Sequence, residues 1–274
     1  MFKIIIMALL IFIGMVGYDS ITDKAQPTTP VQQEQQKISK HEKSAAMALF
    51  TSLLPPKEEW PSPVHKFYLA FNMDEVIDPI RQNPNWTGLD AMSRDIPQAL
   101  IAIEDHAFYN HGAIAVEGIL RATLANINAG EVVQGGSTLT QQFVKNVFLS
   151  HEQSMERKIE EAVLSLMLED NYSKDEILEL YLNTTYFGAG STGIKQASRT
   201  YFGKAPSALT LAEAAVIASL PYAPTGLNPL ENPEGCKKRQ LLVLAAMHKY
   251  GMINQGQLAE AKAEKIRLTN GTIM

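Results

Sequence analysis

The strongest constraint on the fold of this chain is a series of helix-start signals that begins near Asp95. In a capping box, a short polar side chain at a helix start accepts a backbone hydrogen bond from three residues later, where a Glu or Gln reaches back. Three pairs have this spacing: Asp95 with Gln98, Ser173 with Glu176, and Thr210 with Glu213. We expect a helix to begin at each pair.

Apolar residues after these signals recur at the spacing of a helix face. The residues expected on buried faces are Ile96, Leu100, Ile103 and Ala107 in one helix, and Met155, Ile159, Val163 and Leu166 in another over residues 154–170. Residues 252–265 have the pattern of a helical hairpin. Strand signals are few, and residues 184–187 give the best of them. The pattern predicts a mainly α-helical domain.

The N-terminus has the pattern of an export signal. An uncharged apolar run extends from Ile4 to Tyr18 after Met1-Phe2-Lys3. A spanning helix needs about 20 apolar residues and a signal-peptide core roughly 7–15, so this run lies between the two. Because no clear cleavage site follows, we favour a membrane anchor over residues 1–18, with a cleaved signal peptide as the alternative. Either one predicts that the remainder is exported.

The next segment is poor in apolar surface. Residues 19–62 contain many glutamines and prolines, and only residues 44–54 form an apolar helix candidate. Such a composition buries too little surface to offset the entropy of ordering, which predicts a flexible tether before a domain over residues 63–270. The 274-residue chain is 46% hydrophobic with a net charge of −5, which argues against a general nucleic-acid binder. Its single cysteine, Cys236, excludes an internal disulfide.

Glu104 is a candidate catalytic carboxylate. Leu100 and Phe108, four residues to either side, place it at the border of the core. Partial burial disfavours the charged form and raises the pKa of a carboxyl group, which suits a general base or acid near neutral pH. The alternative is an ordinary helix-edge glutamate that pairs with a lysine.

Arg157, Lys158 and Glu161 form a second charged group on one helix. The spacing of Arg157 and Glu161 is that of an exposed ion pair, on the side opposite Ile159. The functional alternative is a carboxylate flanked by two cations that hold a pyrophosphate, with the arginine binding phosphate oxygens in bidentate fashion.

Two glycine-rich segments have different interpretations. Gly135-Gly136-Ser137-Thr138 predicts a tight turn into a helix whose backbone N–H groups attract anions, with Gln141, Lys145 and Asn146 following. Residues 188–193, Gly-Ala-Gly-Ser-Thr-Gly, match the dinucleotide fingerprint, but no parallel-strand pattern surrounds them. We therefore reject a dinucleotide-binding fold.

Several ordered motifs resemble the peptidoglycan glycosyltransferase family, which also forms the polymerising half of bifunctional penicillin-binding proteins. The matching segments are Glu104-Asp105-x-x-Phe108-x-x-His111, Gly135-Gly136-Ser137-Thr138-Leu139-Thr140-Gln141-Gln142, Arg157-Lys158-x-x-Glu161, Ile177-Leu178-Glu179-Leu180-Tyr181-Leu182-Asn183, and a block from Leu211 to Pro229. The resemblance covers roughly residues 96–265. It departs from the family at Ala115, where an acidic residue is usual, and at Gln153, where an arginine is common.

The resemblance implies a fold and a reaction. The fold would be lysozyme-like, with a larger head and a smaller membrane-proximal lobe. The substrates would be lipid II and a growing lipid-linked glycan at the outer leaflet of the cytoplasmic membrane. The chain would be transferred onto lipid II with inversion, forming a β-1,4 bond and releasing undecaprenyl pyrophosphate. Transpeptidases are implied as partners, and nucleic acid is not.

The resemblance also assigns roles to residues. Glu104 would be the general base, and Glu161 would assist the leaving pyrophosphate. The substrate-binding residues would be Ser137, Gln141, Lys145, Asn146, Arg157 and Lys158. No cofactor is implied beyond a divalent cation, Mg²⁺ or Mn²⁺, at the pyrophosphate.

Two other functions stay open. A lysozyme-like hydrolase also uses a helix-borne glutamate, but it has no pyrophosphate for the Arg157-Lys158-x-x-Glu161 group to hold. The departures at Ala115 and Gln153 leave a non-catalytic scaffold of the wall-synthesis machinery as the other alternative. No Ser-x-x-Lys or Lys-Thr-Gly motif of a transpeptidase occurs, so we expect a monofunctional polymerase.

Overall fold

The computed structural model describes residues 68–70, 72–115, 118, 136–149 and 154–274. The predictions for residues 1–18 and 19–62, including the helix over 44–54, lie outside these ranges, as does Gln153. The chain divides into two compact units, Met1–Val76 and Ile77–Met274. All elements from α5 onward belong to the second unit.

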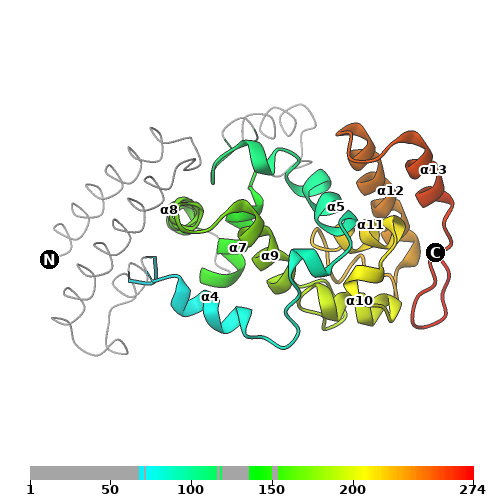
Figure 1. The fold of residues 1–274 in the computed structure, drawn as a ribbon, viewed down its shortest axis with the longest axis horizontal. Coiled ribbons are helices and arrows are strands. Elements are labelled where there is room, and N and C mark those ends of the chain that lie inside the picture. The colour runs from blue at the N-terminus through cyan, green and yellow to red at the C-terminus, as the bar shows by residue number, and fades with distance from the viewer. Residues whose placement is uncertain (1–67, 71, 116–117, 119–135, 150–153) are drawn as a thin grey trace, which may run out of the picture. The chain divides into compact units, whose positions relative to one another are not determined.

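The described elements are helices, and no strand occurs among them, so the predicted mainly α fold is confirmed (Figure 1). The α-helices are α4 (Asp74–Arg81), α5 (Asp95–Glu104), α7 (Leu139–Phe148), α8 (Met155–Asn171), α9 (Lys174–Thr184), α10 (Ile194–Phe202), α11 (Leu211–Ser219), α12 (Pro233–Lys249) and α13 (Gln255–Ala263). The short 3-10 helices are η2 (Leu89–Ala91), η3 (Phe108–Asn110) and η4 (Pro206–Ala208).

Two groups of helices pack within the second unit. Helices α5, α11 and α12 pack against one another, and α13 packs on α12. Helix α7 packs against both α8 and α9, and α10 contacts α9 and α11 (Figure 1). The core of the first group is mainly apolar, because eight consecutive residues of α11, from Ala212 to Ser219, are buried and all but Glu213 and Ser219 are apolar.

Several predicted helix starts are confirmed. Ser173 caps α9 and Thr210 caps α11, each with a complete capping box that is closed by a glutamate. The helix expected at Asp95 also begins there, but its capping box is wrong, since Arg94 is in the cap position and no side-chain cap bond forms. Capping needs a side chain outside the first turn, and Asp95 lies within it.

Three other details differ from the predictions. Residues 252–265 contain one helix, α13, which begins after its cap residue Asn254, instead of a helical hairpin. Residues 184–187 form no strand, and Tyr186 makes only an isolated bridge to Thr192. Helix α5 ends at Glu104, so Ala107 and Phe108 lie beyond it, with Phe108 fully buried in η3.

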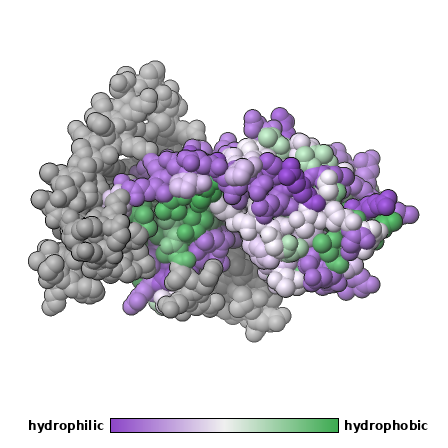
Figure 2. Space-filling view, turned by 90° about the horizontal axis from the view of Figure 1, so that it is seen from below, coloured by the Kyte–Doolittle hydropathy of each residue, from purple (hydrophilic) through white to green (hydrophobic). Residues whose placement is uncertain are grey.

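The predicted buried face of α8 is wrong. Met155 and Ile159 are 78% and 61% exposed, while Glu161, Leu164 and Leu168 are buried. The side of α8 that carries Glu161 faces inward. The burial of its carboxylate is tolerated because Arg157 and Lys158 pair with it. Figure 2 shows one face of the molecule, where the described surface is largely polar, with one larger apolar area and several smaller ones.

The glycines of residues 188–193 form a turn before α10. Gly188 has a φ of 88°, and a Cβ there would lie 2.3 Å from the carbonyl oxygen of Pro224. Gly193 has a φ of 84° and leaves similarly little room beside Asn183. Close backbone approach and left-handed conformation therefore explain these glycines.

Candidate active site

Glu104 ends α5 at the border of the core, as the sequence predicts. The residue as a whole is half-buried, and its Oε2 accepts a hydrogen bond from Nε2 of Gln142 on α7 at 3.0 Å. Burial raises the pKa of Glu104, and the Gln142 hydrogen bond and the charges of Arg239 and Lys145 only partly oppose this. The group is therefore tuned toward proton exchange nearer neutral pH than an ordinary glutamate.

Gln142 is held in turn by α9. The hydroxyl of Tyr181 donates to Oε1 of Gln142 at 3.0 Å. The sequence analysis did not select either residue for the site. The sequence does contain a signal for Gln142. In a capping box at Thr138, the side chain of Gln141 bonds to the backbone of the cap residue, which leaves the side chain of Gln142 available for another contact.

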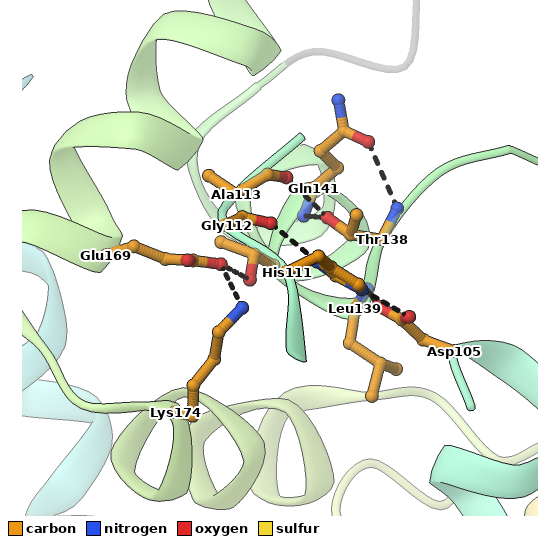
Figure 3. Close-up of polar contacts among 10 residues, drawn as sticks. Asp105, His111, Gly112, Ala113, Thr138, Leu139, Gln141, Glu169 and Lys174 are labelled. Atoms are coloured by element: carbon orange, nitrogen blue, oxygen red, sulfur yellow. Dashed lines mark hydrogen bonds and ion pairs between the residues drawn. The ribbon is translucent and has the colours of Figure 1, made fainter. Parts of the chain in front are cut away.

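The structure places Gln141 in that capping box. Its Oε1 accepts from the backbone N–H of Thr138 at 3.0 Å, and its own N–H donates to Oγ1 of Thr138 at 3.1 Å (Figure 3). The side chain is buried at 3% exposure. Gln141 thus shapes the start of α7, while Gln142 reaches Glu104.

Asp105 links the end of α5 to the start of α7. Its Oδ2 accepts from the backbone N–H of Leu139 at 3.1 Å, and its Oδ1 lies 2.6 Å from Nε2 of His111 (Figure 3). The N–H groups of Leu139 and Gln141 therefore already have protein acceptors. The anion at this helix start is the carboxylate of Asp105, and these two groups do not support the predicted anion cradle.

His111 lies between two acceptors. Its Nδ1 is 2.6 Å from the carbonyl oxygen of Gly112, and its Nε2 faces Asp105. Burial lowers the pKa of His111, but the hydrogen bonds to Asp105 and Gly112 outweigh it and leave the pKa raised. Because a backbone carbonyl and a carboxylate both accept hydrogen bonds, the geometry favours the doubly protonated ring.

Glu161 is the second carboxylate, and it is 2% exposed on the inward face of α8. Arg157 donates from Nη1 to Oε2 at 2.9 Å, and Lys158 pairs with Oε1. Lys158 also donates to Oγ of Ser137 at 3.1 Å. The expectation of an exposed ion pair is therefore wrong, because α8 turns this group inward against the start of α7.

Arg157 in this group has a hydrogen-bond donor that is not used by the described residues. Nε of Arg157 is buried and has no hydrogen-bond partner in the described part of the chain. A buried guanidinium nitrogen without a partner is costly, and an anionic ligand would supply its acceptor.

Lys145 and Asn146 lie in the last turns of α7, and both are exposed. The charge of Lys145 acts on the carboxyl group of Glu104, so this lysine belongs to the surroundings of the base. The structure therefore brings together two sets of predicted site residues. One is Glu104 with Lys145, and the other is Glu161 with Arg157, Lys158 and Ser137.

The described residues do not offer a ready-made metal site. No group of three His, Cys, Asp or Glu side chains is arranged among them to hold an ion. Both oxygens of Glu161 are engaged by cations. These residues therefore do not fit a protein-bound divalent cation, and the predicted ion has no role in the steps proposed below.

Comparison with known proteins agrees with these features. The family model described as "Transglycosylase" matches residues 73–248. A Cupriavidus necator protein named as a transglycosylase is 41% identical over 194 residues, which cover 71% of this chain and 84% of that protein. Penicillin-binding protein 1A of Neisseria flavescens is 44% identical over 185 residues, which cover 68% of this chain and 23% of that protein.

Other relatives give the same result. Penicillin-binding protein 2D of Bacillus subtilis is 44% identical over 181 residues, which cover 66% of this chain and 26% of that protein. The chain thus spans about a quarter of the length of these penicillin-binding proteins. With the family model matched over more than half of its length, the chain belongs to the transglycosylase family and is a peptidoglycan glycosyltransferase.

Proposed function

We propose that this enzyme polymerises glycan strands from lipid II. The acceptor is the 4-hydroxyl of lipid II, and the donor is the growing chain on undecaprenyl pyrophosphate. The observation that carries the proposal is the pairing of a proton-accepting carboxylate, Glu104, with a separate buried carboxylate, Glu161, that is flanked by two cations. A transferase that expels pyrophosphate needs both functions, whereas a hydrolase has no pyrophosphate to hold.

The proposed step is a single displacement. The Glu104 carboxylate takes the proton of the acceptor hydroxyl, and that oxygen attacks the anomeric carbon of the donor. The bond from this carbon to the pyrophosphate oxygen breaks, and undecaprenyl pyrophosphate leaves with inversion to a β-1,4 bond. The raised pKa of Glu104 supports its role as the base.

The leaving pyrophosphate would be held by cations. Arg157 has a buried Nε without a partner in the described structure, and Lys158 already contacts Ser137 at the start of α7. Preorganised charge of this kind stabilises a developing anion without reorganisation during the reaction. Lys145 would add charge on the side of Glu104. Ser137 and Asn146 would contact the donor sugars and phosphate, and Gln141 would support this site by closing the capping box at the start of α7.

We also propose the cellular setting that lipid II requires. The catalytic domain would lie at the outer face of the cytoplasmic membrane, with a smaller lobe next to the lipid and transpeptidases as partners. Within the residues that the structure describes, none of the helices has both the length and the apolar character needed to cross a membrane.

Incubation of the purified full chain with lipid II tests this proposal. We expect long glycan strands and free undecaprenyl pyrophosphate, resolved by gel electrophoresis and mass spectrometry. Cleavage of preformed glycan would favour the hydrolase, and lipid II left unchanged would favour the scaffold. Either result contradicts the proposed polymerase.

A further inference from the structure

Three helices meet at the Glu104 carboxyl group through two consecutive hydrogen bonds. Tyr181 on α9 donates to Oε1 of Gln142 on α7 at 3.0 Å, and Nε2 of Gln142 donates to Glu104 on α5 at 3.0 Å. Tyr181 is 1% exposed, so water does not compete for its hydroxyl. The two bonds thus connect a rigid, buried residue to the predicted base.

The Glu104 carboxylate accepts hydrogen bonds and donates none, so the donor end of the Gln142 amide faces it, and the Tyr181 hydroxyl holds the amide in this orientation by donating to Oε1. An amide has one end that accepts hydrogen bonds and one that donates them. The flipped amide would place its oxygen against the carboxylate and its NH₂ group against the phenol, which loses the bond that Glu104 accepts.

The phenol is a dependable donor at this position. Burial raises the pKa of Tyr181, and the neighbouring charge of Glu104 raises it further. The hydroxyl therefore stays protonated across the pH range in which an enzyme of this class works. The side chain acts as a fixed hydrogen-bond donor and takes no part in proton transfer.

Other charges near Glu104 come from three places. Arg239 on α12 and Lys145 on α7 lower its pKa, and Asp105, next to it in sequence, raises it. None of these groups restrains the carboxylate through a short hydrogen bond among the contacts of the described residues. Gln142 is thus the neighbour that sets its position.

We propose that Tyr181 is a positioning residue for the reaction: through Gln142, it holds the Glu104 carboxylate where it receives the acceptor proton. This inference rests on the proposed function of Glu104 as general base. It predicts that a tyrosine buried in α9, outside the predicted substrate-binding residues, affects the rate of a step that it never touches.

Tyr181→Phe tests the proposal because it removes one hydroxyl and keeps the ring. We expect kcat on lipid II to fall between about twofold and tenfold, the rate equivalent of one net hydrogen bond, with KM unchanged. Because a freed amide no longer stabilises the carboxylate, the pKa of Glu104 rises and the acid limb of the pH–rate profile moves to higher pH. Unchanged kcat with an unmoved acid limb would overturn the proposal.

Tyr201→Phe is a matched control. Tyr201 is also fully buried, and its hydroxyl donates to the carbonyl oxygen of Phe187 at 2.7 Å, away from Glu104. This variant loses a comparable bond, so a general loss of stability would appear in both. We expect its kcat and acid limb to match the wild type. If both variants shift the acid limb equally, Tyr181 has only a structural role.

A second pair of variants covers the case in which Tyr181→Phe does not fold. Gln142→Glu keeps an acceptor for Tyr181 but presents a like charge to Glu104, whereas Gln142→Leu removes both interactions. We expect the acid limb to move further in Gln142→Glu than in Gln142→Leu. Equal shifts would contradict the positioning role of the amide.

One measurement separates this proposal from the proposed function. The pKa of Glu104 can be followed by carbon-13 NMR of labelled protein without any substrate. If the wild type does not polymerise lipid II, the proposed function fails, and the NMR titration still tests the positioning role. We expect a higher pKa of Glu104 in Tyr181→Phe than in the wild type, and equal values would overturn it.

Discussion

Arg157 and Glu161 lie one helical turn apart and form an ion pair at 2.9 Å whose carboxylate is almost fully buried. A buried ion pair costs more to break than an exposed one, since the remaining charge loses its partner without gaining full hydration. This pair therefore gives a direct test of whether α8 turns its charged side inward.

Glu161→Gln should lower the free energy of unfolding by about 2 kcal/mol, less than for a fully buried pair because Lys158 is partly exposed. The matched control is Glu176→Gln, whose pair with Arg81 is exposed and whose capping box a glutamine preserves. We expect the control to lose less than about 1 kcal/mol. Urea denaturation measures both, and equal losses would contradict the buried arrangement.

Asp105→Asn should lower the pKa of His111. The asparagine keeps the shape of the side chain but removes the negative charge that favours the imidazolium. Because the folded pKa of His111 is raised, the stabilisation is complete below the unfolded value and is lost as pH rises through the folded value. Proton NMR titration of the imidazole measures this, and an unchanged pKa would mean that Asp105 does not stabilise the charged ring.

Arg157→Lys should weaken binding of the donor pyrophosphate and of phosphoglycolipid inhibitors. Lysine keeps the charge but lacks the fork of donors, including the buried Nε that has no partner in the described structure. Lys145→Ala should also weaken binding, because it removes one phosphate contact. Calorimetric titration with an inhibitor measures both. Affinities equal to the wild type would leave these cations with a purely structural role.

The sequence predicted the helical class and the position of Glu104 at the border of the core. The capping pairs at Ser173 and Thr210 are local signals, and the structure confirms both. The half-buried position of Glu104 followed from its apolar neighbour Leu100 at helical spacing. These features depend only on residues close in sequence, which is why they could be predicted.

The missed features depend on tertiary contacts. The apolar residues Met155 and Ile159 define a plausible buried face of α8, but Glu161 faces inward, paired with Arg157 and Lys158 of the same helix, and Lys158 also contacts Ser137. Hydrophobic periodicity cannot register a buried charged residue whose ion-pair partners are packed against another segment. Likewise, the role of Gln142 depends on its contacts with Tyr181, 39 positions later, and with Glu104, 38 positions earlier.

Glu104→Gln should stabilise the folded protein at neutral pH. A carboxyl group whose pKa is raised by folding binds its proton more tightly when folded, so its ionisation destabilises the folded state above that pKa. Gln removes this cost and can still accept from Gln142. Thermal unfolding at several pH values should show the variant's advantage near pH 7 and its disappearance below the unfolded pKa of Glu104. A variant less stable at neutral pH would contradict the raised pKa.

The most direct test of the central claim is the rate at which Glu104→Gln polymerises lipid II. The substitution is nearly isosteric and removes only the base, so we predict a fall of about 10²–10⁴-fold in kcat with the fold intact. Glu213→Gln, at a buried glutamate in the capping box of α11, is the control and should retain activity. A Glu104→Gln enzyme that keeps more than about a tenth of wild-type turnover would contradict the assignment of Glu104 as the general base.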